Sequence, residues 1–211
     1  MTAAGRAQSL YEKAHALMQK SDGGARLAEA AALMREAGDA GHAAAANNFG
    51  ALLQYGRGVP ENLAAARSYY AMAAEAGLAA AKFNLGFMCW HGLGGSEDKA
   101  AALDWFLEAG AQGDADALTH LGRIFMTGDG VPQDTRRAKG YWRQGAEAGD
   151  HRCAFNLGVA LAGGHGAPPD LVAAHGWFSR AEASGNSDAH REIAKIEAVM
   201  TPAEKQAAQA L

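Results

Sequence analysis

Apolar residues recur at helical spacing in pairs of short runs that a polar, glycine-rich break separates. Between residues 79 and 114, the run AAAKFNLGFMCW shows this spacing, HGLGGSED interrupts it and KAAALDWFLEAGAQG resumes it. Each run is long enough for about three helical turns. The pattern therefore predicts a helix, a glycine-rich loop and a second helix.

The same unit returns every 36 residues, as five glycines at one fixed interval show: Gly41, Gly77, Gly113, Gly149 and Gly185. Further columns of glycine, alanine and aromatic residues keep this period. A fixed period in this range is typical of a repeat array, in which each unit packs mainly on its neighbours. The sequence predicts an all-α fold, an α/α superhelical solenoid of 36-residue helix-turn-helix repeats.

We predict a single solenoid domain over residues 1–211, with a degenerate first repeat at 7–42, in which Ala14 replaces a helix glycine and Lys20 and Asp22 replace loop glycines. Four regular repeats follow at 43–78, 79–114, 115–150 and 151–186. Residues 187–211 are expected to form C-terminal capping helices, the last one starting with a capping box of Thr201 and Glu204.

Two of the columns, one polar and one of glycine, have a local structural explanation, whereas a third is explained by packing. The column Asn62, Asp98, Asp134 and Asp170 lies where the second helix of each repeat needs an N-cap. The column from Gly41 to Gly185 suits the left-handed residue that ends that helix. Glycines inside the first helices, such as Gly86, cost helix stability, so we expect an aromatic residue of the following helix to lie against their backbone. Trp105 and Trp177 are the expected partners.

Composition argues against several classes of function. The net charge of -4 and the pI near 6.0 disfavour bulk binding to nucleic acid or to an anionic membrane. The sequence contains no apolar run of about 18 residues, so no membrane insertion is predicted. The N-terminus lacks the apolar core of a signal peptide, so a cytoplasmic location is expected. Cys89 and Cys153 lie in different columns, which favours two core residues over a disulfide or a metal pair.

Motifs of catalysis are also missing from the sequence. The eight histidines show no HExxH spacing, and no GxSxG or GxxxxGK[ST] string occurs. The glycine-rich loops return in four repeats, which indicates architecture rather than a phosphate site. We expect no enzyme activity and no cofactor.

The columns together resemble the Sel-one-like repeat, an α/α-repeat family related to the tetratricopeptide repeat. The resemblance rests on an LG pair, a GxGV loop, an aspartate, an alanine, an aromatic residue, AA and a terminal glycine, as in His120-Leu121-Gly122 with Gly128-Asp129-Gly130-Val131. It covers roughly residues 7 to 186. It implies a curved scaffold that binds other proteins without chemistry, as bacterial relatives do at the cell envelope or in signalling complexes.

The resemblance also implies that the first helix of each repeat lines a concave groove. Counting from the LG pair places one aromatic and one basic group of side chains there. The expected partner-binding residues are Asn47, Tyr55, Phe83, Phe87, Trp90, His91, Arg123, Met126, Arg152, Phe155, Arg191 and Lys195. For the aromatic group the alternative is packing against a neighbouring helix, and for the basic group it is an ordinary solvated surface.

Two functions follow from this reading. The first is a non-enzymatic adaptor that binds a peptide or protein segment in its groove, with apolar side chains near Trp90 and carboxylates near Arg152. The second is a structural subunit that forms a homodimer through its groove or its terminal caps. The sequence alone does not identify the partner.

Overall fold

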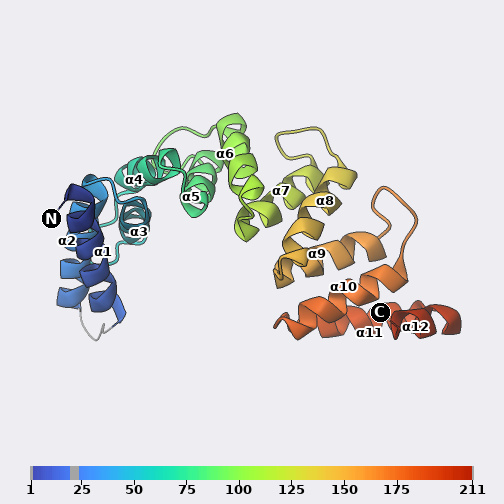
Figure 1. The fold of residues 1–211 in the computed structure, drawn as a ribbon. Coiled ribbons are helices and arrows are strands. Elements are labelled where there is room, and N and C mark those ends of the chain that lie inside the picture. Colours follow the sequence, from blue (N-terminus) through green and yellow to red (C-terminus); the bar gives the residue numbers. More distant parts are fainter. Residues whose placement is uncertain (1, 20–23, 211) are drawn as a thin grey trace. The chain divides into compact units, whose positions relative to one another are not determined.

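The computed structural model describes residues 2–19 and 24–210, which form twelve α-helices and no strand (Figure 1). The helices are α1 (Ala3–Gln19), α2 (Gly24–Asp39), α3 (Ala43–Gln54), α4 (Leu63–Glu75), α5 (Ala79–Trp90), α6 (Lys99–Ala111), α7 (Ala115–Thr127), α8 (Thr135–Glu147), α9 (His151–Ala162), α10 (Leu171–Ala183), α11 (Ala189–Val199) and α12 (Pro202–Ala208). Lys20 and Asp22, the expected loop positions of the first repeat, lie outside the described residues.

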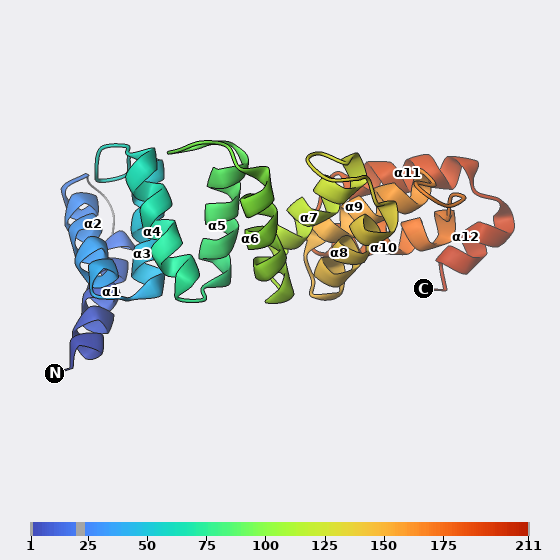
Figure 2. The same ribbon diagram turned by 90° about the horizontal axis from the view of Figure 1, so that it is seen from above.

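Consecutive helices pack side by side in each of two compact units, residues 1–109 and 110–211 (Figures 1 and 2). In the first unit α1 packs on α2, α2 on α3, α3 on α4 and α4 on α5. In the second, the chain of neighbours runs from α7 to α10, and α10 also contacts α11 and α12. The predicted all-α solenoid of helix pairs is confirmed. None of the described helices has the length and apolar character that a membrane span requires.

The predicted helix caps are confirmed. The side chains of Asn62, Asp98, Asp134 and Asp170 each accept a hydrogen bond from the backbone N–H three residues on, at 2.9 to 3.0 Å. The glycines that follow the second helices have φ between +84° and +98°, the left-handed conformation expected of them. The capping box of α12 is also present.

The glycine-rich loops join one repeat to the previous one. The second glycine of the loop has positive φ and lies against the start of the second helix of the preceding repeat: Gly58 against Leu27 and Ala28 of α2, and Gly94 against Leu63 of α4. A Cβ at Gly58 would come within 2.6 Å of the Leu27 carbonyl group. These positions therefore need glycine both for its conformation and for the absence of a side chain.

The glycines inside the first helices receive an aromatic ring from the following helix, but not the ring that was predicted. Tyr70, Phe106, Trp142 and Phe178 lie against Gly50, Gly86, Gly122 and Gly158, and all four rings are buried. Trp105 and Trp177 precede two of these residues and are only half-buried. The predicted register was wrong by one residue, which on a helix turns a side chain by about 100°.

Gly122→Ala tests this contact, because its new methyl group would overlap the indole of Trp142, which also donates from Nε1 to the Thr119 carbonyl at 3.2 Å. Overpacking of this kind costs about 1–3 kcal/mol, so we expect a fall in the free energy of unfolding of that size, measured by urea unfolding.

The matched control is Gly140→Ala in α8, where an added Cβ meets nothing within 4 Å. It should stabilise the chain by roughly 0.5–1 kcal/mol through helix propensity. If both variants gained stability, Gly122 would not be required by the packing of Trp142.

Candidate protein interaction site

The candidate site is the surface that the first helices of the repeats present, which we call the first-helix face. In the first unit α1, α3 and α5 provide it, and in the second unit α7, α9 and α11 do. The twelve side chains expected on this face divide into exposed, half-buried and buried groups, and the division changes the predicted site.

Trp90 does not belong to an exposed cluster. Its exposed fraction is 4%, its ring centroid lies 6.1 Å from that of Phe106, and the ammonium group of Lys99 lies 5.1 Å above its ring. The expectation that Trp90 presents its ring to a partner is therefore wrong. The ring packs against the second helix of its own repeat, which is the alternative that the sequence left open.

The other aromatic side chains that were expected on this face in the first unit are at least partly exposed. Phe83 and Phe87 are half-buried and tilted toward each other, with ring centroids 6.3 Å apart, and Phe87 lies 4.4 Å from the ring of His91. His91 and Tyr55 are exposed and occupy the same place at the ends of α5 and α3. The exposed fraction of Tyr55 is 66%. Aromatic rings thus follow this face from α3 to α5.

Asparagine side chains connect α3 and α5. Asn84 Nδ2 donates to Asn47 Oδ1 at 2.9 Å, and Asn47 Nδ2 donates to Asn48 Oδ1 at 3.3 Å. All three side chains are half-buried. Asn47, predicted to contact a partner, therefore has a structural role in joining two repeats.

A hollow of about 370 Å³ opens on this face between α1 and α3. Two first helices and the loop after α3 contribute to it, and the lining residues are His15, Met18, Gln19, Asn48, Ala51, Leu52, Tyr55 and Arg57. The walls are held in place at the start of α3, where the ring of His42 stacks on Tyr11 at 4.5 Å. His42 Nδ1 accepts from the Ala45 N–H, so its Nε2 donates to Gln8 Oε1 at 2.9 Å.

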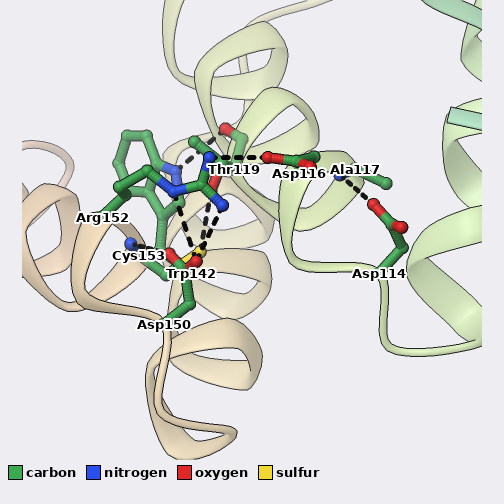
Figure 3. Close-up of polar contacts among 8 residues, drawn as sticks. All are labelled: Asp114, Asp116, Ala117, Thr119, Trp142, Asp150, Arg152 and Cys153. Atoms are coloured by element: carbon green, nitrogen blue, oxygen red, sulfur yellow. Dashed lines mark hydrogen bonds and ion pairs between the residues drawn. The ribbon is translucent and has the colours of Figure 1, made fainter. Parts of the chain in front are cut away.

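Arg152 of α9 is bound to two carboxylates of its own chain (Figure 3). Its Nη1 lies 2.6 Å from Asp116 Oδ1, and its Nη2 lies 2.8 Å from Asp150 Oδ2. Hydrogen bonding to Asp150 is the main reason that the pKa of Arg152 is raised. The guanidinium that was expected to anchor a partner's carboxylate thus joins α9 to α7.

The carboxylates near Arg152 differ in their pKa because their surroundings differ (Figure 3). Burial alone would raise the pKa of Asp150, but hydrogen bonds from Arg152 and from the Cys153 N–H outweigh it and lower that pKa. Burial raises the pKa of Asp114. Burial likewise raises the pKa of the Cys153 thiol to about 11, so this cysteine stays a thiol near neutral pH and is a poor nucleophile.

Most of the other basic side chains expected at the site in the second unit are paired with carboxylates of this chain. Arg191 pairs with Asp188 at 2.5 Å and Lys195 with Glu192 at 2.7 Å. Phe155 is half-buried against Phe178, with centroids 5.6 Å apart, and Met126 is also half-buried. Arg123 is exposed, and its Nη2 lies 3.4 Å from His120 Nδ1.

Two features escaped the sequence analysis although signals for them exist. Asp116 and Arg152 stand 36 residues apart, so opposite charges in one column indicated their pairing across neighbouring repeats. Ala51 is a small residue in a column that otherwise holds larger side chains, which indicated a gap on the first-helix face. Arg57 gave no signal, because loop residues follow no helical period.

Trp90→Ala should lower the free energy of unfolding by about 3–5 kcal/mol, since it removes a buried indole. Tyr55→Ala should change it by less than roughly 0.5 kcal/mol, because that ring is mostly exposed. Urea unfolding of both variants tests the assignment. Equal effects would contradict the division into core and surface.

Arg152→Gln should lower the free energy of unfolding by roughly 0.5–1 kcal/mol at pH 7. Because the pKa of Asp150 is lowered in the folded chain, the pair stabilises fully above the ordinary value of 3.8 and less as the pH falls through the lowered pKa. The loss should therefore shrink in unfolding experiments below about pH 4.

Arg123→Gln provides the control for this variant, since Arg123 lies beside His120 on the same face without a carboxylate partner among the described residues. We expect it to leave stability unchanged at both pH values. A stability of Arg152→Gln equal to that of the parent chain at pH 7 would mean that Arg152 is available to a partner after all.

Solved structures similar to this chain are repeat proteins. The chain is 28% identical to a Sel1 repeat protein from Oxalobacter formigenes, with a TM-score of 0.83 over 97% of this chain and 84% of that one. It is 26% identical, with a TM-score of 0.79, to a protective antigen of uropathogenic Escherichia coli with an SLR fold, covering 90% of this chain. The chain spans only 41% of that antigen's length.

An immunity protein from Pseudomonas aeruginosa shares the fold, at 21% identity and a TM-score of 0.59 over 87% of this chain and 67% of that one. The comparison with curated proteins gave no match. The family model of the Sel1 repeat matches residues 43–78, 79–114, 115–150 and 151–186. The chain therefore belongs to the Sel1 repeat family.

Proposed function

We propose that this protein is a non-enzymatic adaptor that binds a protein or peptide segment on the first-helix face of its first unit. Sel1 repeat proteins are generally non-catalytic scaffolds for protein interaction. The observation that carries the proposal is the open surface of α1, α3 and α5, where a hollow of about 370 Å³ adjoins the exposed ring of Tyr55.

The distribution of apolar groups supports this placement. Exposed large apolar side chains are few among the described residues, and Tyr55 at the C-terminal end of α3 is one of them. The half-buried ring of Phe87 and the exposed ring of His91 follow on α5. Aromatic residues, Tyr and Trp above all, are enriched among the residues that dominate binding energy at protein interfaces, because they bury a large area.

The distribution of charge supports the same placement. In the second unit, Arg152, Arg191 and Lys195 are paired with carboxylates of this chain, so a partner would have to displace these pairs. Breaking a pair costs its own stabilisation and the new contact must exceed that cost. In the first unit, Arg6 and Lys82 are paired with carboxylates too. None of the described residues that line the hollow forms such a pair, so binding there meets no competition of this kind.

Affinity capture from host lysate tests the proposal by comparing the parent chain with the double variant Tyr55→Ala, Phe87→Ala. We expect captured protein to fall at least about tenfold, which corresponds to a loss of about 1.4 kcal/mol of binding free energy, while circular dichroism shows unchanged helicity. Mass spectrometry of the captured protein identifies the partner.

Met72→Ala is the matched control, since Met72 is an apolar residue with an exposed fraction of 42% on α4, a second helix. Capture should be unchanged by it. Equal capture by the parent and the double variant would contradict the proposal. Recovery of only further copies of this chain, with a dimer mass in light scattering, would favour the self-associating structural subunit instead.

A further inference from the structure

The hollow between α1 and α3 exists because one column of the repeat holds a small residue at this place. Positions 36 residues apart in this column carry His15, Ala51, Phe87, Arg123, Val159 and Lys195. Ala51 lines the hollow, whereas the ring of Phe87, one repeat later, lies over the end of α5 beside His91. A side chain the size of that of Phe87 at position 51 would occupy this space.

We infer that this hollow binds a single aromatic side chain of a partner peptide that carries a carboxylate side chain close by in sequence. The inference rests on the proposed function, and it specifies the partner's chemistry. The volume of about 370 Å³ lies in the lower part of the range of about 300–1,000 Å³ that is typical of sites for small organic groups.

The lining favours an aromatic ring over an aliphatic side chain. Tyr55 and His15 provide two rings that can stack or meet a guest ring edge to face. Met18 provides a thioether, and sulfur contacts with aromatic rings are favourable by about 0.3–1.5 kcal/mol. Leu52 is buried, with 3% exposed, and forms an apolar wall. The polar amide of Asn48 lies beside these groups and can bond to the peptide backbone.

The charge at the rim favours a carboxylate. Arg57 lines the hollow, and within the described part of the chain no carboxylate pairs with its guanidinium. Glu61, the acidic residue of the same loop, is not among the lining residues. Glu12 lines an adjoining, smaller hollow on α1 that shares His15 and Gln19 with this one, and it accepts a hydrogen bond from Gln8 Nε2 at 2.8 Å. Arg57 is therefore the only Lys, Arg, Asp or Glu side chain among the described residues that line the hollow, and its fork of N–H donors suits a carboxylate.

Selection from a random peptide library displayed on phage, with the full chain as bait, tests the inference. We expect enriched peptides to contain Trp, Phe or Tyr with Asp or Glu within about two positions. Arg57 itself lines the hollow, so a carboxylate that reaches it must lie close in sequence to the aromatic residue. An enriched peptide is then synthesised with blocked ends and a fluorescent label, so that only its side chains carry charge.

Fluorescence polarisation of this peptide with variants of the full chain measures each contribution. Ala51→Phe, which copies the residue of the next repeat, should weaken binding at least about tenfold while helicity is retained. Arg57→Gln should weaken it about three- to tenfold, and replacing the peptide's acidic residue by its amide should do the same. Once either change is made, the other should have little further effect.

Arg143→Gln is the control for lost positive charge, because Arg143 is exposed on α8 of the second unit, and it should leave binding unchanged. Binding to the parent chain should also weaken as the salt concentration rises, since Arg57 is exposed and its charge is screened. Arg57→Gln should lose most of this salt dependence.

Undiminished binding to Ala51→Phe would overturn the inference, as would enriched peptides without an acidic residue or no enrichment at all. If a peptide binds Ala51→Phe as well as the parent chain but fails to bind Tyr55→Ala, Phe87→Ala, the hollow is not the site while the proposed function stands. Undiminished binding to both variants would contradict the inference and the proposed function together.

Discussion

The contact between a glycine of the first helix and an aromatic ring of the following helix is the interaction on which each of the four regular repeats depends. The rings of Tyr70, Phe106 and Phe178 are at most 1% exposed, and each covers the helix backbone where its glycine has no side chain. Buried aromatic rings contribute more to stability than a single helical glycine costs. This contact fixes the distance between the two helices of a repeat.

Stacking of repeats then follows from contacts made at a few fixed columns. The second loop glycine packs on the preceding second helix, as Gly94 does on Leu63, and asparagines such as Asn47 and Asn84 join neighbouring first helices. Since these contacts need only a few columns, other positions of the first helices can change without loss of the fold. The column that holds Ala51 and Phe87 shows this freedom, and in the first unit it leaves a hollow at Ala51.

Much of the fold could be predicted from the sequence because its determinants are local and periodic. Helix caps such as Asn62 and left-handed glycines such as Gly77 depend only on a few adjacent residues. The sequence therefore predicts the role of each of these columns without knowledge of the packing. It was harder to predict which of the aromatic residues packs against the glycine. Two adjacent columns both carry rings, and only the three-dimensional packing shows that Tyr70 rather than Tyr69 meets the glycine.

The candidate site was predicted less completely for two physical reasons. Trp90 lies on a helix with apolar residues on more than one face, so spacing alone could not show that Phe106 and Lys99 cover its ring. Arg152 was expected to be available to a partner. Its ion pair with Asp116 joins two different repeats, so the sequence of one repeat alone does not reveal it. Burial and pairing across repeats, rather than residue type, determine which side chains remain for a partner.

Site-specific photo-crosslinking from the first-helix face tests the central claim most directly. A photoreactive benzophenone side chain placed at Tyr55, at the end of α3, is compared in the host cell with one placed at Met72, on α4; both positions are exposed. The account predicts a crosslinked partner from position 55 and none from position 72. A partner crosslinked from position 72 alone would contradict it.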